Sequence, residues 1–209
     1  MHLEMKWFAA LVVCALVACN KEEEVPPVDP GPPTSPHARV RFKGPDRIQL
    51  ELSRILELSP TELCNELGLY DCFAVHQVAL GGTDPFGVAL YSPTETSTAT
   101  TPLAIERVVL AGCLERAVRD LSAPASAVIF KDLNVDAQGK LNVESDAVAR
   151  AIDALYTRSM QRHAKENEVE HLRGLYRGIE ASPDAVKPAQ EWAALGCFAV
   201  LTTLETLFY

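Results

Sequence analysis

The sequence is poor in aromatic residues and lacks most of the patterns that identify enzymes and nucleic-acid-binding proteins. Only 7% of its residues are aromatic. The formal net charge is −9, and the sequence contains no run of basic residues. Phosphate backbones and anionic lipid surfaces repel such a chain, so we expect no nucleic-acid partner. The G-x-S-x-G, H-E-x-x-H and P-loop motifs are also missing, and we predict that the protein is not an enzyme.

A long hydrophobic run is missing as well. The cleanest apolar run extends from Trp7 to Leu16, about ten residues, whereas a helix that spans a bilayer needs roughly 20. A run of this length after a short opening segment that contains Lys6 is typical of an export signal. It leads into Leu16-Val17-Ala18-Cys19, where a small residue directly precedes a cysteine.

These residues resemble the signal peptide and lipobox of bacterial lipoproteins, and the resemblance covers residues 1–19 only. In that family the cysteine thiol is diacylated and the preceding segment is removed. The resemblance implies that residues 1–18 are a signal peptide and that Cys19 carries the lipid that makes the membrane a partner. Asn20 follows the cysteine, which is similar to Gram-negative lipoproteins that reach the outer membrane. The alternatives are an ordinary secretory signal that is cut near Ala18 and an uncleaved helix in which the two cysteines are incidental.

A proline-rich segment follows the cysteine. Residues 20–36 hold six of the 14 prolines and have almost nothing apolar to bury, so we expect them to be disordered or polyproline-like. In the extended proline form these residues reach about 50 Å. We therefore predict a lipidated cysteine and linker over 19–39 and a folded domain over 40–209, which is long enough for a core of its own.

The cysteines beyond Cys19 and the signal segment number four, and an even number in an exported chain predicts two disulfides with three possible connectivities. We favour Cys64–Cys72 and Cys113–Cys197. The first pair encloses a short segment with a turn signal at Gly68. In the second pair a glycine precedes each cysteine, so two helices could approach closely enough for a disulfide.

Two alternatives remain open for these cysteines. They could serve as small buried apolar residues without a disulfide. A free Cys72 could also form a thiolate and imidazole pair with His76, four residues later, which would favour an enzyme. His163 and His171 lie eight residues apart, and we interpret them as solvated histidines on a helix surface rather than a metal pair.

Apolar periodicity and capping signals predict an all-α fold, a compact bundle of about six helices behind the disordered proline-rich tether. We expect helices at residues 45–58, 59–67, 71–80, 101–121 and 188–208, with a long helical tract from Asp146 that breaks near Lys165. Residues 81–101 are expected to form a loop, where a partner could bind. The segment from Trp192 to Leu201 is apolar on nearly every side and should run through the core.

For the helix at 101–121 we expect a specific inward face. Its predicted inward side chains are Leu103, Val109 or Leu110, Leu114, Ala117 and Leu121, while Arg116 should face solvent.

One segment suggests a metal ion. Asn134, Asp136 and Gln138 place oxygen ligands at the first, third and fifth positions of a loop that resembles the calcium loops of EF-hand and dockerin proteins, with Gly139 sixth. The twelfth position is Ser145 instead of a bidentate acid, which predicts poor calcium affinity. The alternative is a polar connection that ends in a helix cap at Ser145.

Together these features predict a lipid-anchored helical binding, scaffold or assembly component of the cell envelope, without a cofactor and with an envelope protein as partner. The alternative is a periplasmic protein that binds a small molecule or calcium, and a less favoured one is an enzyme of unfamiliar type.

Overall fold

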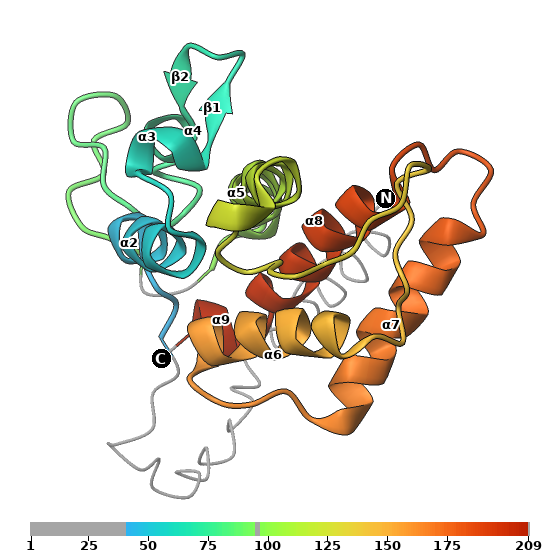
Figure 1. Ribbon diagram of the computed structural model, residues 1–209. Helices are drawn as coiled ribbons and strands as arrows, with labels where there is room; N and C mark the ends of the chain where they lie inside the picture. Colours follow the sequence, from blue (N-terminus) through green and yellow to red (C-terminus); the bar gives the residue numbers. More distant parts are fainter. Residues whose placement is uncertain (1–40, 95–96, 209) are drawn as a thin grey trace, which may run out of the picture. The chain divides into compact units, whose positions relative to one another are not determined.

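The computed structural model describes residues 41–94 and 97–208 (Figure 1). The predicted signal peptide, Cys19 and the tether lie outside these residues. Five helices of 12 residues or more dominate the described chain: α2 (Pro45–Leu56), α5 (Thr101–Ser122), α6 (Asp146–Met160), α7 (Glu166–Glu180) and α8 (Pro188–Leu201). None of the described helices is long and apolar enough to cross a bilayer.

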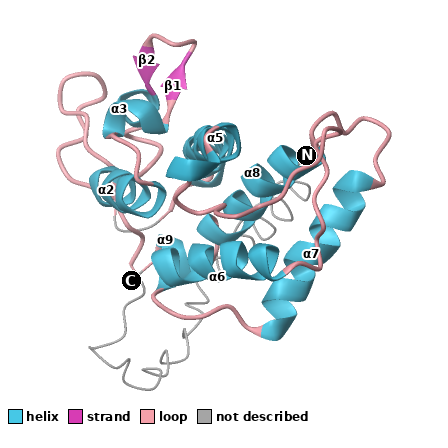
Figure 2. Cartoon of the chain, in the orientation of Figure 1, coloured by secondary structure: helices cyan, strands magenta, loops and turns pink. Residues whose placement is uncertain are grey.

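Shorter elements complete the described chain. These are the single-turn helices α3 (Pro60–Leu63), α4 (Cys72–Val75) and α9 (Leu204–Leu207), the 3-10 turn η1 (Pro124–Ser126) and the antiparallel strands β1 (Asn65–Glu66) and β2 (Tyr70–Asp71). Within the described residues the fold is therefore mostly α. The small hairpin, visible as the two strands in Figure 2, corrects the all-α prediction, and eight α-helices replace the expected six.

Helix α8 forms the centre of the core, as its sequence predicts. It packs against α5 on one side and against α6 and α7 on the other (Figure 1). The Trp192 side chain is 1% exposed, and its indole N–H donates to the Leu172 carbonyl oxygen of α7 at 2.8 Å. The rings of Phe130 and Tyr176 meet Trp192 edge-on, at centroid distances of 6.1 and 6.4 Å.

Several predicted helix boundaries are wrong for local reasons. The helix expected over 59–67 ends at Leu63, because the chain then becomes extended at Cys64 to form the hairpin. The same hairpin reduces the helix expected over 71–80 to the single turn of α4. The last helix breaks after Leu201, where the Thr202 and Thr203 hydroxyls donate to backbone carbonyl oxygens and compete with the helical pattern.

The break near Lys165 is confirmed. Helix α6 ends at Met160, Gln161 adopts a left-handed conformation with φ of 57°, and α7 begins at Glu166. His163 therefore lies in the connection and not on one helix with His171.

Helix α5 turns a different face inward from the one predicted. Leu103 and Leu114 are 67% and 47% exposed, Leu110 is also exposed, and Arg116 is buried. Cys113 decides this orientation, because its disulfide to α8 fixes which side of α5 faces the core. Val109 and Ala117 are buried as predicted. The rest of the inward face is made by small and β-branched residues: Ala104, Ile105, Val108 and Gly112.

The buried Arg116 pairs with a buried acid one turn later. Its Nε lies 3.0 Å from Oδ1 of Asp120, whose side chain is fully buried, and its Nη1 donates to the Leu56 carbonyl oxygen at 3.1 Å. The Asp120 carboxylate also accepts three backbone N–H groups from the segment after η1, those of Val128, Ile129 and Phe130, at 2.8–3.0 Å. This carboxylate therefore organises an irregular segment that has no helix of its own.

The two ends of the described chain lie together. Phe42 and Phe208 form an antiparallel bridge with ring centroids 5.5 Å apart, and the Lys43 N–H donates to the Leu207 carbonyl oxygen at 3.0 Å. The β1–β2 hairpin projects from the opposite end of the view in Figure 1.

Candidate interaction surface

Both disulfides are present in the favoured pairing. Cys113 joins Cys197 with their Cα atoms 5.7 Å apart, and this bond ties the two central helices α5 and α8 together. Cys64 joins Cys72 at a Cα distance of 5.5 Å, next to the first strand pair of the hairpin, Asn65 and Asp71. The second bond therefore holds the hairpin at its base.

The tip of this hairpin exposes two leucines. Leu67 and Gly68 both have positive φ, 55° and 69°, and the Leu69 N–H donates to the Glu66 carbonyl oxygen at 3.0 Å, which is the pattern of a type I′ turn. Asparagine or glycine is preferred at the first of these positions, since a leucine there costs roughly 1–2 kcal/mol. Leu67 is nevertheless 89% exposed, so its presence does not serve the core.

A second exposed tip lies in the loop between α4 and α5. The backbones of Asp84 and Leu90 exchange two hydrogen bonds, and the Asp84 carboxylate accepts the Gly87 N–H at 2.8 Å. This closed turn holds Phe86 fully exposed, with Val88 exposed beside it. The loop that the sequence predicts over 81–101 is thus partly ordered, and its order presents an aromatic side chain to solvent.

Exposed apolar side chains concentrate in this part of the chain. Of the 15 large hydrophobic residues exposed among the described residues, eight lie between positions 67 and 91. We call them the apolar lobe: Leu67, Leu69, Tyr70, Val75, Val78, Phe86, Val88 and Tyr91. Scattered surface hydrophobics are normal, whereas a concentration of them marks an interaction surface.

The outward face of α5 adjoins the hairpin. The Glu66 carboxylate of β1 lies 3.1 Å from Nε of Arg107 on α5, and 2.6 Å from Nε2 of His76. Leu103, Leu110 and Leu114, which we call the leucine stripe, flank Arg107 along the same face of the helix. The contacts of Glu66 therefore connect the apolar lobe with the leucine stripe.

These contacts also overturn the thiolate and imidazole alternative. Cys72 is fully buried and disulfide-bonded, so it has no thiol to activate, and His76 binds a carboxylate instead.

The calcium-loop residues have a structural role in the described chain. The Asp136 carboxylate accepts the Gln138 and Lys140 N–H groups at 2.9 and 2.8 Å, which closes a turn with Gly139 at positive φ. The Gly139 carbonyl oxygen accepts the N–H of Ala189 at the start of α8. The described residues contain no group of three metal-binding side chains, at Asn134 or elsewhere.

A cleft of about 500 Å³ lies beside α6, and several of its polar groups are bound to other parts of the protein. Within it, Arg158 donates through Nε to the Ile55 carbonyl oxygen at 2.7 Å. Asp153 accepts from Nδ1 of His163 at 2.9 Å and from the Ala164 N–H. Because these groups point to the protein, the cleft supports a small-molecule site less well than the exposed lobe supports a partner.

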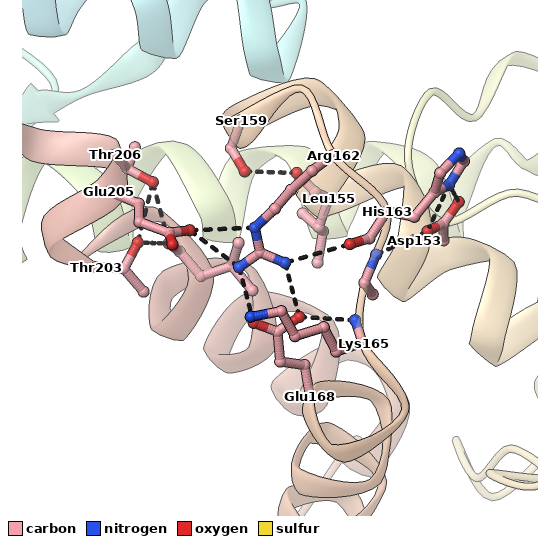
Figure 3. A network of polar contacts seen from close by, with 12 residues as sticks. Asp153, Leu155, Ser159, Arg162, His163, Lys165, Glu168, Thr203, Glu205 and Thr206 are labelled. Atoms are coloured by element: carbon pink, nitrogen blue, oxygen red, sulfur yellow. Dashed lines mark hydrogen bonds and ion pairs between the residues drawn. The ribbon is translucent and has the colours of Figure 1, made fainter. Parts of the chain in front are cut away.

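A polar network fixes α9 to the connection between α6 and α7 (Figure 3). Arg162 binds Glu168 through two hydrogen bonds of 2.8 and 2.7 Å and Glu205 of α9 at 2.9 Å, and its guanidinium lies over the Tyr156 ring at 5.0 Å. Hydrogen bonding to Arg162, aided by the Lys165 backbone N–H, lowers the pKa of Glu168 to about 2.

This network predicts a stability loss in acid. A carboxyl whose pKa is lowered on folding contributes its stabilisation above its ordinary pKa of about 4.5, and that contribution is lost as the pH falls from 4.5 towards 2. We expect Glu168→Gln to melt below wild type at pH 6, and the two melting temperatures to converge near pH 2.5. A constant difference across a circular-dichroism pH series would contradict this role.

Comparison with known protein families, characterised proteins and solved structures finds no match to this chain. The surface must therefore be interpreted from its own chemistry. Sequence analysis missed the apolar lobe, although one signal was available: Leu67-Gly68-Leu69 places leucines around a turn glycine, where polar residues are usual.

Proposed function

We propose that this protein is a lipid-anchored, protein-binding component of the bacterial cell envelope. The observation that supports the binding role is the apolar lobe, part of which lies on a hairpin held by a disulfide and part on the turn closed by Asp84 and Leu90. A hairpin whose backbone is held by a disulfide binds at a lower entropic cost than a flexible segment, because less backbone freedom is lost on binding.

The envelope location is supported by two features. The segment ending in Cys19 resembles a lipobox, and disulfides persist in oxidising compartments outside the cytoplasm. In this proposal the tether leaves the folded unit at residue 41, beside the Phe42–Phe208 bridge, and the hairpin projects from the other end in Figure 1.

The test uses a photo-crosslinking amino acid at position 86 of the full-length protein in intact cells. We expect a covalent adduct with one envelope protein in wild type and its loss in Leu67→Asn. The same substitution should raise the free energy of unfolding by up to about 1 kcal/mol, because asparagine tolerates the left-handed conformation better than leucine. Loss of capture with a gain in stability would separate a binding role from a folding role.

Position 186 supplies the matched control, since Val186 is also exposed but lies before α8, outside the apolar lobe. Equal capture from both positions would contradict a specific surface. A Cys19→Ser variant tests the anchor separately, and we expect it to leave the membrane fraction. Retention of that variant in the membrane would contradict the lipid anchor.

A further inference from the structure

The charge around the apolar lobe is one-sided. Between Arg54 and Arg107 the sequence has 52 residues without a lysine or arginine, while it has seven acids there. Three of these acids are neutralised by arginines from other parts of the chain: Glu57 by Arg158, Glu62 by Arg119 and Glu66 by Arg107.

Other acids in this stretch keep their charge unpaired. Asp71 lies at the base of the hairpin, Asp84 at the base of the second tip and Glu106 beside Arg107 on α5, and no described lysine or arginine forms an ion pair with any of them. Each of these acids is therefore close in the sequence to exposed apolar residues: Asp71 follows Tyr70, Asp84 closes the turn that carries Phe86, and Glu106 precedes Leu110 by one helical turn.

The spacing of the leucine stripe indicates the kind of element that could pack against it. Leu103, Leu110 and Leu114 are separated by seven and four residues, which is the spacing of a seam that packs against another helix. The opposite face of α5 is buried in the core, so the helix has apolar side chains on two faces. This pattern is typical of a helix that packs against neighbours on both faces. In the described chain the second side is only partly covered, since Leu103, Leu110 and Leu114 are 67%, 40% and 47% exposed.

We propose that the leucine stripe and the apolar lobe bind a basic amphipathic helix of a partner protein, with its apolar face on the leucines and its lysines or arginines beside Asp71, Asp84 and Glu106. This inference rests on the proposed function and specifies its partner. A second copy of the chain would bring the same unpaired acids together, and an anionic membrane would be repelled by them.

The test uses two labelled peptides of about 18 residues with leucines at the same heptad positions, one filled with lysine and the other with glutamate. We expect the mature chain to bind the lysine peptide at least about tenfold more tightly by fluorescence anisotropy. The variant Asp71→Asn, Asp84→Asn, Glu106→Gln keeps every acceptor oxygen, and we expect it to lose roughly tenfold in affinity for that peptide.

Matched controls distinguish this surface from general acidity. Asp146→Asn, Glu166→Gln, Asp184→Asn removes the same charge from exposed positions elsewhere and should leave affinity unchanged. Leu110→Ser with Leu114→Ser should abolish binding, whereas Leu195→Ser, at a comparably exposed leucine of α8, should not. Circular dichroism confirms that each variant is folded.

Several outcomes would overturn the proposal. These are equal affinity for the two peptides, an equal loss in the charge control, stripe-dependent binding to phosphatidylglycerol vesicles, or a dimer that Leu110→Ser dissociates. If position 86 captures an envelope protein through a segment without excess lysine or arginine, the proposed function stands and this inference fails. If position 86 captures nothing specific, the proposed function itself fails.

Discussion

Replacing Asp120 with alanine is expected to lower the free energy of unfolding by about 3–5 kcal/mol. The change removes the partner of the buried Arg116 and leaves three backbone N–H groups without an acceptor. An uncompensated buried charge is costlier than the loss of the attraction itself. Urea unfolding followed by circular dichroism measures the difference.

Helix α5 offers a matched control for this substitution. Glu115 and Arg119 form an ion pair of the same i,i+4 spacing at 2.6 Å, but both side chains are exposed to solvent. Glu115→Ala should cost less than about 1 kcal/mol, since water screens and replaces an exposed pair. If the two alanine variants unfolded at the same urea concentration, burial of the Asp120 carboxylate would not matter to stability.

Removing the disulfide between α5 and α8 is expected to have a similar effect on stability. Cys113 and Cys197 are 84 residues apart, and closing a loop of that length stabilises the fold by about 4.5 kcal/mol through the unfolded chain. The variant Cys113→Ala, Cys197→Ala should therefore melt roughly 9–18 °C lower, as differential scanning calorimetry would show.

The hairpin disulfide provides the comparison. Cys64 and Cys72 close a loop with a separation of only eight residues, worth about 2.5 kcal/mol by the same relation. Compared with loss of the Cys113–Cys197 disulfide, its removal should lower the free energy of unfolding less and should reduce crosslinking to the partner more. The reason is that it releases the hairpin without separating α5 from α8. The interpretation is wrong if the short-loop variant is the less stable of the two.

Much of the fold could be predicted from the sequence where local signals agree with burial. The run of apolar residues around Trp192 predicts the central helix, and the polar stretch near Lys165 predicts the break between α6 and α7. Each of these signals depends on residues that are near one another in the sequence. The disulfide between Cys113 and Cys197 is predicted correctly, but the glycines that precede the two cysteines face other elements: Gly112 lies against Leu56 and Gly196 against Leu172.

The orientation of α5 could not be predicted in this way. Both of its faces are apolar, so periodicity alone does not decide which side is buried. Two contacts from distant parts of the chain, the disulfide at Cys113 and the closeness of Gly112 to Leu56, act together with the nearby segment that binds Asp120. The leucines that a periodicity argument places in the core are for this reason available at the surface.

The apolar lobe escaped prediction for a related reason. Leu67 and Phe86 have the composition of core residues, and only the turn geometry places them in solvent. An interpretation based on hydrophobic patterns assigns apolar residues to the core by default, because most of them are buried in folded proteins.

The bridge between Phe42 and Phe208 has a practical consequence for experiments on this protein. It brings the two ends of the described chain together, and circular permutation requires ends that lie close to each other. A reporter fused after the last residue would emerge beside the tether's attachment point, which leaves the hairpin unobstructed. By the same geometry, a short peptide could join the two ends of the folded unit and new termini could be opened elsewhere on its surface.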